Sequence, residues 1–280
     1  MATTRYWCGT NALCNMGEFV DRVILITGAS SGIGAETALH FAAEGAGLAL
    51  VGRDEGRLEK TAQDCLAKGL AKDKVLTIKA DMCVEEGVKR IMESTITHFG
   101  RLDVLVNNAG ISLFDTLTSE ALLENYDHTT KVNVRSIIQL TNLATPHLIE
   151  SKGSVVNVSS ICGKRVVRNY LSYNITKAVI DQFTRCTAVD LASKGVRVNA
   201  VNPGTIMTPI FSNHGLSEEE LREQLGKEHP LGRVGEPSDV ASVIKFLASN
   251  AATFVTGETL SIDGGRQCSC AEGYPFTFGE

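Results

Sequence analysis

Short apolar runs that alternate with longer helical patterns constrain this chain more than any other feature. Seven such runs of five or six residues occur: RVILIT (22–27), LALVG (48–52), KVLTIK (74–79), DVLVN (103–107), SVVNVS (154–159), RVNAVN (197–202) and TLSID (259–263). Continuous β-branched runs indicate strands that are buried on both faces, and alternation with helices indicates right-handed parallel crossovers. The sequence therefore predicts an α/β fold with a doubly wound parallel sheet of about seven strands and helices on both faces.

The length of 280 residues suits one large α/β domain. We expect this domain over residues 21–265, between an N-terminal tail (1–20) and a C-terminal tail (266–280). Residues 204–236 are rich in Gly, Pro and charge and follow the sixth run, so they predict a substrate lid.

Charge and hydropathy exclude several classes of function. The net charge is −5 and the pI about 5.7, which argues against nucleic acid as a partner. No stretch has the ~20 apolar residues of a membrane span, and the N-terminus shows no signal-peptide pattern. The eight cysteines form no C-x-x-C pair and no zinc spacing with histidine, so we expect thiols in a reducing compartment and no metal. These features predict a soluble cytoplasmic protein.

The stretch TGASSGIG (27–34) follows the first predicted strand and opens the first predicted helix. In this position Gly28 permits a tight turn, Gly32 lets the backbone approach a ligand, and Gly34 allows close packing of the helix. The helix N-terminus then faces an anion. Although the spacing differs from the commoner G-x-G-x-x-G, its context predicts a Rossmann-type dinucleotide site.

The end of the second predicted strand indicates which dinucleotide binds. A carboxylate there binds the ribose 2′-hydroxyl of NAD, whereas an arginine accommodates the 2′-phosphate of NADP. The sequence has Gly52 and then Arg53, so we predict NADP(H), with Arg57 as a second phosphate partner. The alternative is NAD(H), with Arg53 only starting the loop and pairing with Asp54 or Glu55.

A tyrosine and a lysine lie four positions apart in NYLSYNITKAVI (169–180), which reads as a helix. Residues with this spacing share a helical face, so Tyr173 and Lys177 are neighbours. A nearby ammonium favours the ionised form of a phenol, whose pKa is ordinarily near ~10. The pair predicts acid–base chemistry, against the alternative that the spacing arose by chance.

Together these motifs resemble the short-chain dehydrogenase/reductase family. The resemblance rests on TGASSGIG, NNAG (107–110), Ser159-Ser160, YNITK (173–177) and PG (203–204), each after the expected run. It implies hydride transfer between NADP(H) and a carbonyl or secondary alcohol, with a steroid-like, xenobiotic or 3-oxoacyl ketone as substrate. The alternatives are an NAD-dependent alcohol dehydrogenase and a catalytically idle dinucleotide-binding scaffold.

The resemblance also implies roles for individual residues. Tyr173 would be the general acid, Lys177 would bind the nicotinamide ribose and lower the Tyr173 pKa, and Ser160, thirteen residues before Tyr173, would hold the substrate oxygen. Asn133 would bend a helix and hold a water near the lysine. Besides Tyr173 and Lys177, the implied cofactor-binding residues are Gly28, Ser30, Ser31, Gly32, Ile33, Gly34, Arg53, Asp81, Met82, Asn108, Ala109, Gly110, Pro203, Gly204, Ile206 and Thr208.

The small-molecule substrate is expected beside the tyrosine. Predicted contacts are Ser160, Cys162, Tyr170, Tyr173 and Met207, with Val166, Val167, Asn169, Ile210, Phe211 and His214 as further candidates. The resemblance implies a homotetramer or homodimer through the helices near 119–150 and 170–194, which are rich in apolar residues. The aromatic C-terminal tail would pack on a neighbouring subunit or cap a pocket.

Overall fold

The computed structural model describes residues 17–209 and 217–269, which form one parallel sheet in the order β3-β2-β1-β4-β5-β6-β7. The strands are β1 (Val23–Thr27), β2 (Gly47–Gly52), β3 (Val75–Lys79), β4 (Val104–Asn107), β5 (Ser154–Val158), β6 (Arg197–Pro203) and β7 (Thr259–Ile262). Each end lies within one residue of the apolar run that predicted it. The predicted doubly wound sheet is therefore confirmed.

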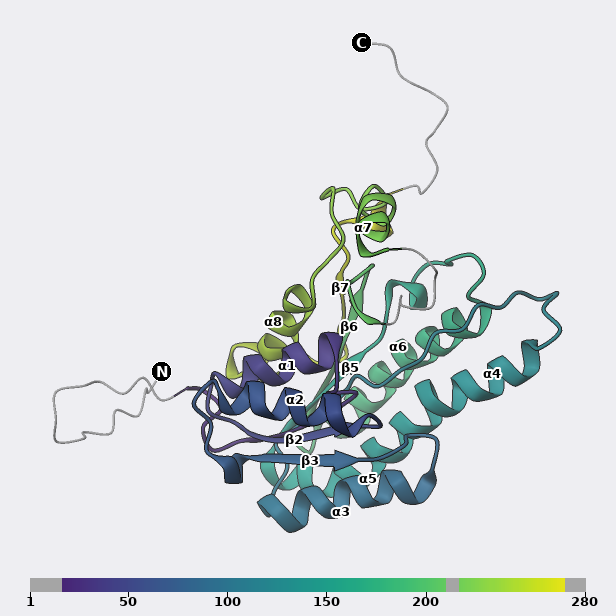
Figure 1. The fold of residues 1–280 in the computed structure, drawn as a ribbon. Coiled ribbons are helices and arrows are strands. Elements are labelled where there is room, and N and C mark those ends of the chain that lie inside the picture. The colour runs from purple at the N-terminus through teal and green to yellow at the C-terminus, as the bar shows by residue number, and fades with distance from the viewer. Residues whose placement is uncertain (1–16, 210–216, 270–280) are drawn as a thin grey trace.

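Helices cover both faces of the sheet (Figure 1). One face carries α1 (Gly32–Ala42), α2 (Glu55–Leu66) and α8 (Pro237–Ala248), and the other carries α3 (Glu85–Phe99), α5 (Ser136–Ser151) and α6 (Leu171–Ala192), with α4 (Leu122–Thr130) leading into α5. A separate apolar cluster fills each interface, one around Phe41 and Leu50, the other around Leu105 and Leu140. Because both faces are covered, the strands read as continuous apolar runs.

The strand order reverses at β1, which pairs with β2 on one side and with β4 on the other. In doubly wound sheets the chain diverges at such a switch point and leaves a crevice beyond the carboxyl ends of the strands. The loops after β1 and β4 therefore meet there.

Two predicted boundaries need correction. Phe19 is only 1% exposed and packs edge-on against Phe41, with ring centroids 4.9 Å apart, so the domain begins before residue 21. The helix predicted near 119–150 is not continuous, because a π-helical segment, Lys131–Arg135, separates α4 from α5.

None of the described helices is both long and apolar enough to cross a bilayer.

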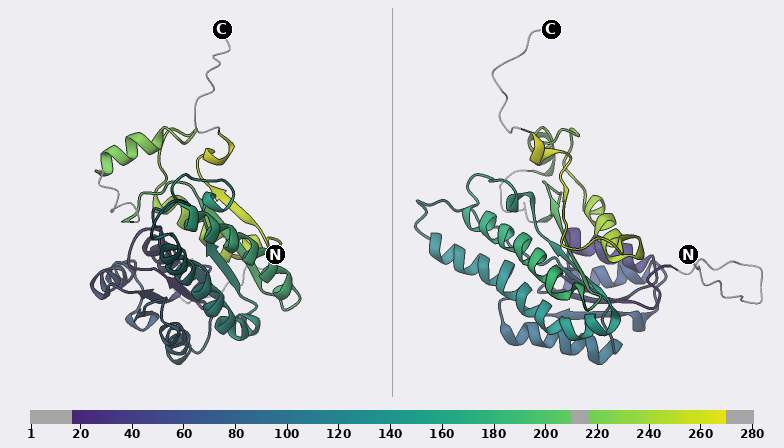
Figure 2. Two further views of the ribbon diagram at one scale, coloured as in Figure 1. Left: turned by 90° about the vertical axis from the view of Figure 1, so that its right-hand side faces the viewer. Right: turned by 180° about the vertical axis from the view of Figure 1, so that it is seen from behind.

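The segment predicted as a lid, 204–236, leaves and rejoins the domain at one place, where Ile206 pairs with Gly235. Between them lies α7 (Glu218–Gly226), which sits at the same end of the molecule as the chain that follows β7 (Figures 1 and 2). Movement of this segment stays a prediction. The candidates Ile210, Phe211 and His214, and the tails 1–16 and 270–280, lie outside the described residues.

Candidate active site

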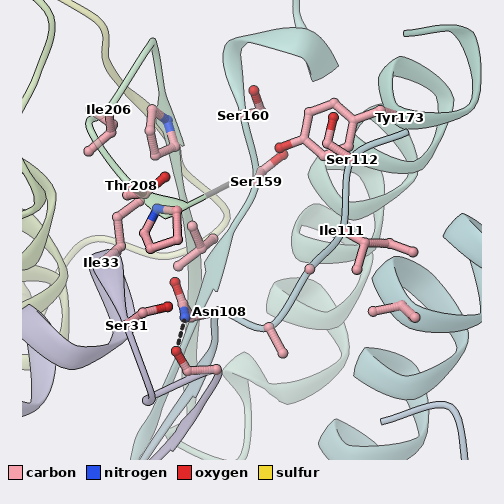
Figure 3. A pocket seen from close by; sticks show the side chains of 18 of the residues that line it. Ser31, Ile33, Asn108, Ile111, Ser112, Ser159, Ser160, Tyr173, Ile206 and Thr208 are labelled. Carbon is pink, nitrogen blue, oxygen red and sulfur yellow. Dashed lines mark hydrogen bonds between the residues drawn. The ribbon is translucent and has the colours of Figure 1, made fainter. Parts of the chain in front are cut away.

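A cavity of about 500 Å³ lies at the switch point, where the loops after β1, β4, β5 and β6 meet α6. It gathers most of the predicted site residues. Those in the described part of the chain that lie outside its lining are Gly34, Asn133, Val166, Asn169 and Met207. Met207 instead donates its backbone N–H to the carbonyl of Gly235 at 2.9 Å. Figure 3 shows Ser160 and Tyr173 on one side of the cavity and Ile206 and Thr208 on the other.

The turn after β1 is shaped for an anion. Gly28 has a left-handed φ of 66°, and a Cβ on Gly34 would lie 2.3 Å from the Gly28 oxygen, so neither position accepts a side chain. Helix α1 follows Ser31 without a side-chain cap and has no acidic residue in its first turn. Its free N–H groups and positive dipole end suit the pyrophosphate of a dinucleotide.

The NNAG turn is tied to the end of β1. The Thr27 hydroxyl accepts hydrogen bonds from the backbone N–H groups of Asn108 and Ala109, each at 3.0 Å. The Asn108 amide donates back to the carbonyl of Thr27 at 2.9 Å. These bonds hold the two loops of the crevice together, which leaves a preformed floor for the ligand.

Arg53 lies at the end of β2 and lines the cavity. The neighbouring carboxylates have other partners: Asp54 caps α2 and pairs with the Arg57 Nε at 2.7 Å, and Glu55 pairs with Lys79 at 3.0 Å. Within the described residues neither carboxylate forms an ion pair with Arg53, and the choice between NADP(H) and NAD(H) stays a prediction.

The predicted catalytic side chains meet at the other end of the cavity. The Ser160 side chain and the Tyr173 ring lie on the same side of the cavity, and the Lys177 Nζ lies 5.4 Å from the centroid of the Tyr173 ring (Figure 3). The Ser159 hydroxyl is engaged elsewhere, because it donates to the carbonyl of Lys177 at 3.1 Å. The arrangement therefore presents Ser160 and Tyr173 together to a substrate oxygen.

The electrostatics of this pair differ from the expectation. Burial raises the pKa of Tyr173 above its ordinary value, and the Ser160 side chain opposes this only in part. Burial also lowers the pKa of Lys177 to about 8, while its ammonium donates to the carbonyl of Val158 at 2.8 Å. In the chain by itself, loss of water around the phenolate is the largest cause, so the pKa of Tyr173 is raised, opposite to the predicted lowering.

Asn133 lies in the π-helical segment and is fully buried. Its side chain accepts from the N–H of Ile111 at 2.9 Å and donates to the carbonyl of Ile111 at 2.8 Å and to Thr176 at 3.3 Å. A Cβ built on Gly110 would lie 3.3 Å from the Asn133 oxygen and 3.8 Å from the Lys177 Nζ. The helix thus breaks where the asparagine comes beside the lysine.

Two positioning residues are absent from the sequence-based prediction. The carboxylate of Asp115, 2% exposed, accepts from the backbone N–H of Ser172 at 3.0 Å and from its hydroxyl, which anchors the first turn of α6. The Asn202 amide donates to the carbonyl of Ser160 at 2.8 Å and to the carboxylate of Asp181. Asn202 directly precedes the PG motif, a signal that could have indicated it, whereas Asp115 belongs to no motif.

The cavity wall also includes residues that the motifs did not indicate, among them Ile111, Ser112, Leu225 and Arg266. Ser112 follows NNAG by two positions, so its proximity could have been inferred. Arg266 was assigned to the C-terminal tail, and only the fold brings it to the cavity. The described residues contain no cluster of three His, Cys, Asp or Glu side chains that could hold a metal ion.

Known proteins share this architecture over nearly the whole chain. A family model described as "Enoyl-(Acyl carrier protein) reductase" matches residues 28–267. The chain is 38% identical over 245 residues to a 3-oxoacyl-[acyl-carrier-protein] reductase of Thermotoga maritima, covering 87% of this chain and 97% of the relative.

Solved structures agree with the sequence match. A short-chain dehydrogenase/reductase of unknown function from Caenorhabditis elegans, solved with cofactor, superposes with a TM-score of 0.86 at 38% identity, covering 90% of this chain and 97% of that one. A 3-ketoacyl-(acyl-carrier-protein) reductase from Brucella melitensis, complexed with NADH, gives 0.80 at 33% identity, covering 88% and 98%. The chain belongs to the short-chain dehydrogenase/reductase family of oxidoreductases.

Proposed function

We propose that this chain is an NADP(H)-dependent oxidoreductase that reduces a ketone to a secondary alcohol, or catalyses the reverse reaction. The observation that carries the proposal is the meeting of Ser160, Tyr173 and Lys177 in the same cavity as an uncapped helix N-terminus. A protein that only bound a dinucleotide would have no chemical need for an acid, a hydroxyl and a buried ammonium at one end of the site.

When bound, the nicotinamide supplies or accepts the hydride. The glycine-rich turn would hold its pyrophosphate, Asp81 and the NNAG turn its adenosine, and Ile206 and Thr208 its carboxamide. In the reductive direction Ser160 holds the substrate oxygen, and Tyr173 donates a proton to it. Because its pKa is raised, the tyrosine carries that proton at neutral pH.

We propose that Lys177 returns a proton to Tyr173 after the tyrosine has donated its own to the substrate. With a pKa of about 8 its ammonium is largely protonated at neutral pH yet close enough to neutrality to exchange a proton. Asn133 lies beside it on the inner side of the broken helix, where we propose that it holds a water that leads toward solvent.

The choice of NADP over NAD rests on Arg53. It lines the cavity at the end of β2, and the two carboxylates that follow it are bound to Arg57 and Lys79. The second candidate is NAD, because Asp54 also lines the cavity and a relative is complexed with NADH. The guanidinium of Arg53 would favour binding of the 2′-phosphate, whereas the neighbouring Asp54 carboxylate would oppose it.

Titration of the purified protein with NADPH and NADH, side by side, tests this choice. We expect tighter NADPH binding, and we expect Arg53→Asp to move the preference toward NADH by roughly 1–3 kcal/mol, the scale of a charge-assisted hydrogen bond. Lys60→Asp makes the same charge change on the exposed face of α2, outside the cavity lining, and should shift the preference little. Equal shifts in both variants would mean that Arg53 acts only through general charge.

Replacing Tyr173 by Phe separates an enzyme from an idle scaffold. The variant should lose on the order of 10²–10⁴-fold in turnover, the usual contribution of a general acid, while NADPH binding stays nearly unchanged. Tyr126→Phe makes the same change on α4, away from the cavity lining, and should retain full activity. Full turnover by the Tyr173 variant would contradict the proposed role, and absence of turnover of any carbonyl by the wild type would favour the scaffold.

Substrate, assembly and location belong to the same proposal. We retain the ketone classes expected from the sequence, and a 3-oxoacyl group is favoured by the names of two relatives. Helices α5 and α6 expose Ile138, Ile175 and Val179 by 42%, 40% and 40%, which supports their pairing in a cytoplasmic homotetramer or homodimer. Light scattering of the purified protein tests the assembly, since a monomeric mass would contradict it.

A further inference from the structure

A tight turn after β7 brings Arg266 to the cavity wall. Gly264 and Gly265 have φ values of 56° and 85°, a conformation that favours glycine. The carboxylate of Asp263 accepts from the N–H of Gly265 at 3.1 Å and from the N–H of Gln267 at 2.6 Å. The backbone that carries Arg266 is thus held by bonds of its own.

The guanidinium of Arg266 is partly satisfied by the protein. Nη1 donates to the Thr205 hydroxyl at 2.7 Å, and Nη2 pairs with the carboxylate of Glu228, just beyond α7. Nε is buried, and no atom in the described part of the chain accepts its hydrogen. Burial also shields that hydrogen from a ligand in the cavity. Each Nη nitrogen carries a second N–H, however, and Arg266 lines the cavity, so these N–H groups are the ones that a ligand oxygen would meet.

Positive charge dominates this end of the cavity. A second guanidinium, that of Arg165, donates to the carbonyls of Arg266 and Ser269 and lies beside the first. Burial, and then the charge of Arg165, lower the pKa of Arg266. Glu228 is the carboxylate paired with it among the described residues.

This charge is close to the reacting end of the site. Cys162 and Tyr170 line the cavity together with Arg266. The Tyr170 ring centroid lies 6.4 Å from that of Tyr173. A small substrate whose carbonyl is held by Ser160 and Tyr173 could therefore extend an anionic group toward Arg266.

We propose that Arg266 binds the carboxylate of an oxo-acid substrate, with the second N–H of an Nη nitrogen donating to one carboxylate oxygen. The inference rests on the proposed ketone reductase activity and names the class of ketone. In the reaction the carbonyl carbon takes a hydride from the nicotinamide and the carbonyl oxygen takes a proton from Tyr173, which yields a hydroxy acid. The carboxylate itself is unchanged, so Arg266 determines specificity and takes no part in proton transfer.

Five-carbon substrates provide the test. The wild type is assayed with 2-, 3- and 4-oxopentanoate, with the methyl ester of each acid, and with 2-pentanone, which lacks both the charge and the added oxygens. We expect kcat/KM for at least one acid to exceed that for its ester by about tenfold or more, the scale of a charge-assisted hydrogen bond. Arg266→Met should remove most of that preference while changing kcat/KM for the ester by less than about threefold.

Two further variants extend the assay: one is expected to increase the preference for the acid, and the other is a control. Glu228→Gln leaves the guanidinium without its paired carboxylate, so it should lower KM for the acid and increase the preference, an effect that loss of structure would not produce. Lys164→Met removes a nearby cation that binds the Thr259 carbonyl and Ser261 and does not line the cavity, so it should leave the preference unchanged. NADPH binding by Arg266→Met and Arg266→Lys verifies that the site is folded.

The possible failures are distinct. An acid-to-ester ratio that is near one in the wild type, or that Arg266→Met leaves unchanged, would overturn the inference and leave the reductase intact. Reduction of 2-pentanone but of no acid would do the same. If the wild type reduces no carbonyl compound with either NADPH or NADH, the proposed function fails, and the substrate class fails with it.

Discussion

Lys177 provides a direct measure of the electrostatics of the site. Its side chain is 4% exposed, and burial lowers its pKa from 10.5 to about 8. One pKa unit corresponds to about 1.4 kcal/mol, so the difference between 10.5 and about 8 means that the protonated lysine costs the folded state on the order of 3 kcal/mol. Replacing the lysine by methionine removes the titrating group while keeping an unbranched chain.

The sign of the effect follows from proton binding. Below pH 8 the folded and unfolded chains both hold this proton, so the full cost is present. Above pH 8 the folded chain releases it, whereas the unfolded chain keeps it until about pH 10.5. Because the unfolded state then binds more protons, the lysine becomes less destabilising as pH rises, by about 2 kcal/mol between about pH 7 and about pH 9.5.

Urea unfolding of the wild type and of Lys177→Met, both without cofactor, measures this change. The free energy of unfolding is determined across the same pH range, and the wild-type value minus the variant value should rise by about 2 kcal/mol. Other groups that titrate equally in both proteins cancel in the difference, and Tyr173 stays protonated because its pKa is raised. A difference that stays flat within about 0.5 kcal/mol would refute the desolvation of Lys177.

Two other predictions concern the framework of the site. Gly34→Ala should weaken NADP(H) binding at least about tenfold in calorimetry, because the new Cβ would lie 2.3 Å from the Gly28 oxygen. Gly56→Ala, at an open position on α2, is the control. It should bind NADP(H) normally and gain up to about 1 kcal/mol of stability. Asp115→Ala should lower the free energy of unfolding in urea by about 1–3 kcal/mol and should also lower kcat, because it leaves the N–H of Ser172 without its acceptor. An unchanged kcat would show that α6 keeps its position without this carboxylate.

Features that depend on local chemistry were predictable from the sequence. The seven apolar runs correspond to the seven strands, because a strand that is buried on both faces needs apolar residues at successive positions. The glycines of the turn after β1 were recognisable because their positions exclude a side chain. Once each motif was placed at the end of a strand, parallel pairing brought Arg53, Asn108, Ser160 and Tyr173 to one cavity.

Features that depend on distant segments were decided only by the tertiary structure. Asp115 belongs to no motif, and only the fold brings its carboxylate to the start of α6, 57 residues further along the chain. The direction of the Tyr173 pKa shift likewise came from burial, which the four-residue spacing to Lys177 does not report. Arg266 was assigned to a tail by its position in the chain, and the sheet placed it against the cavity, because parallel strands bring their carboxyl ends together regardless of their separation in sequence.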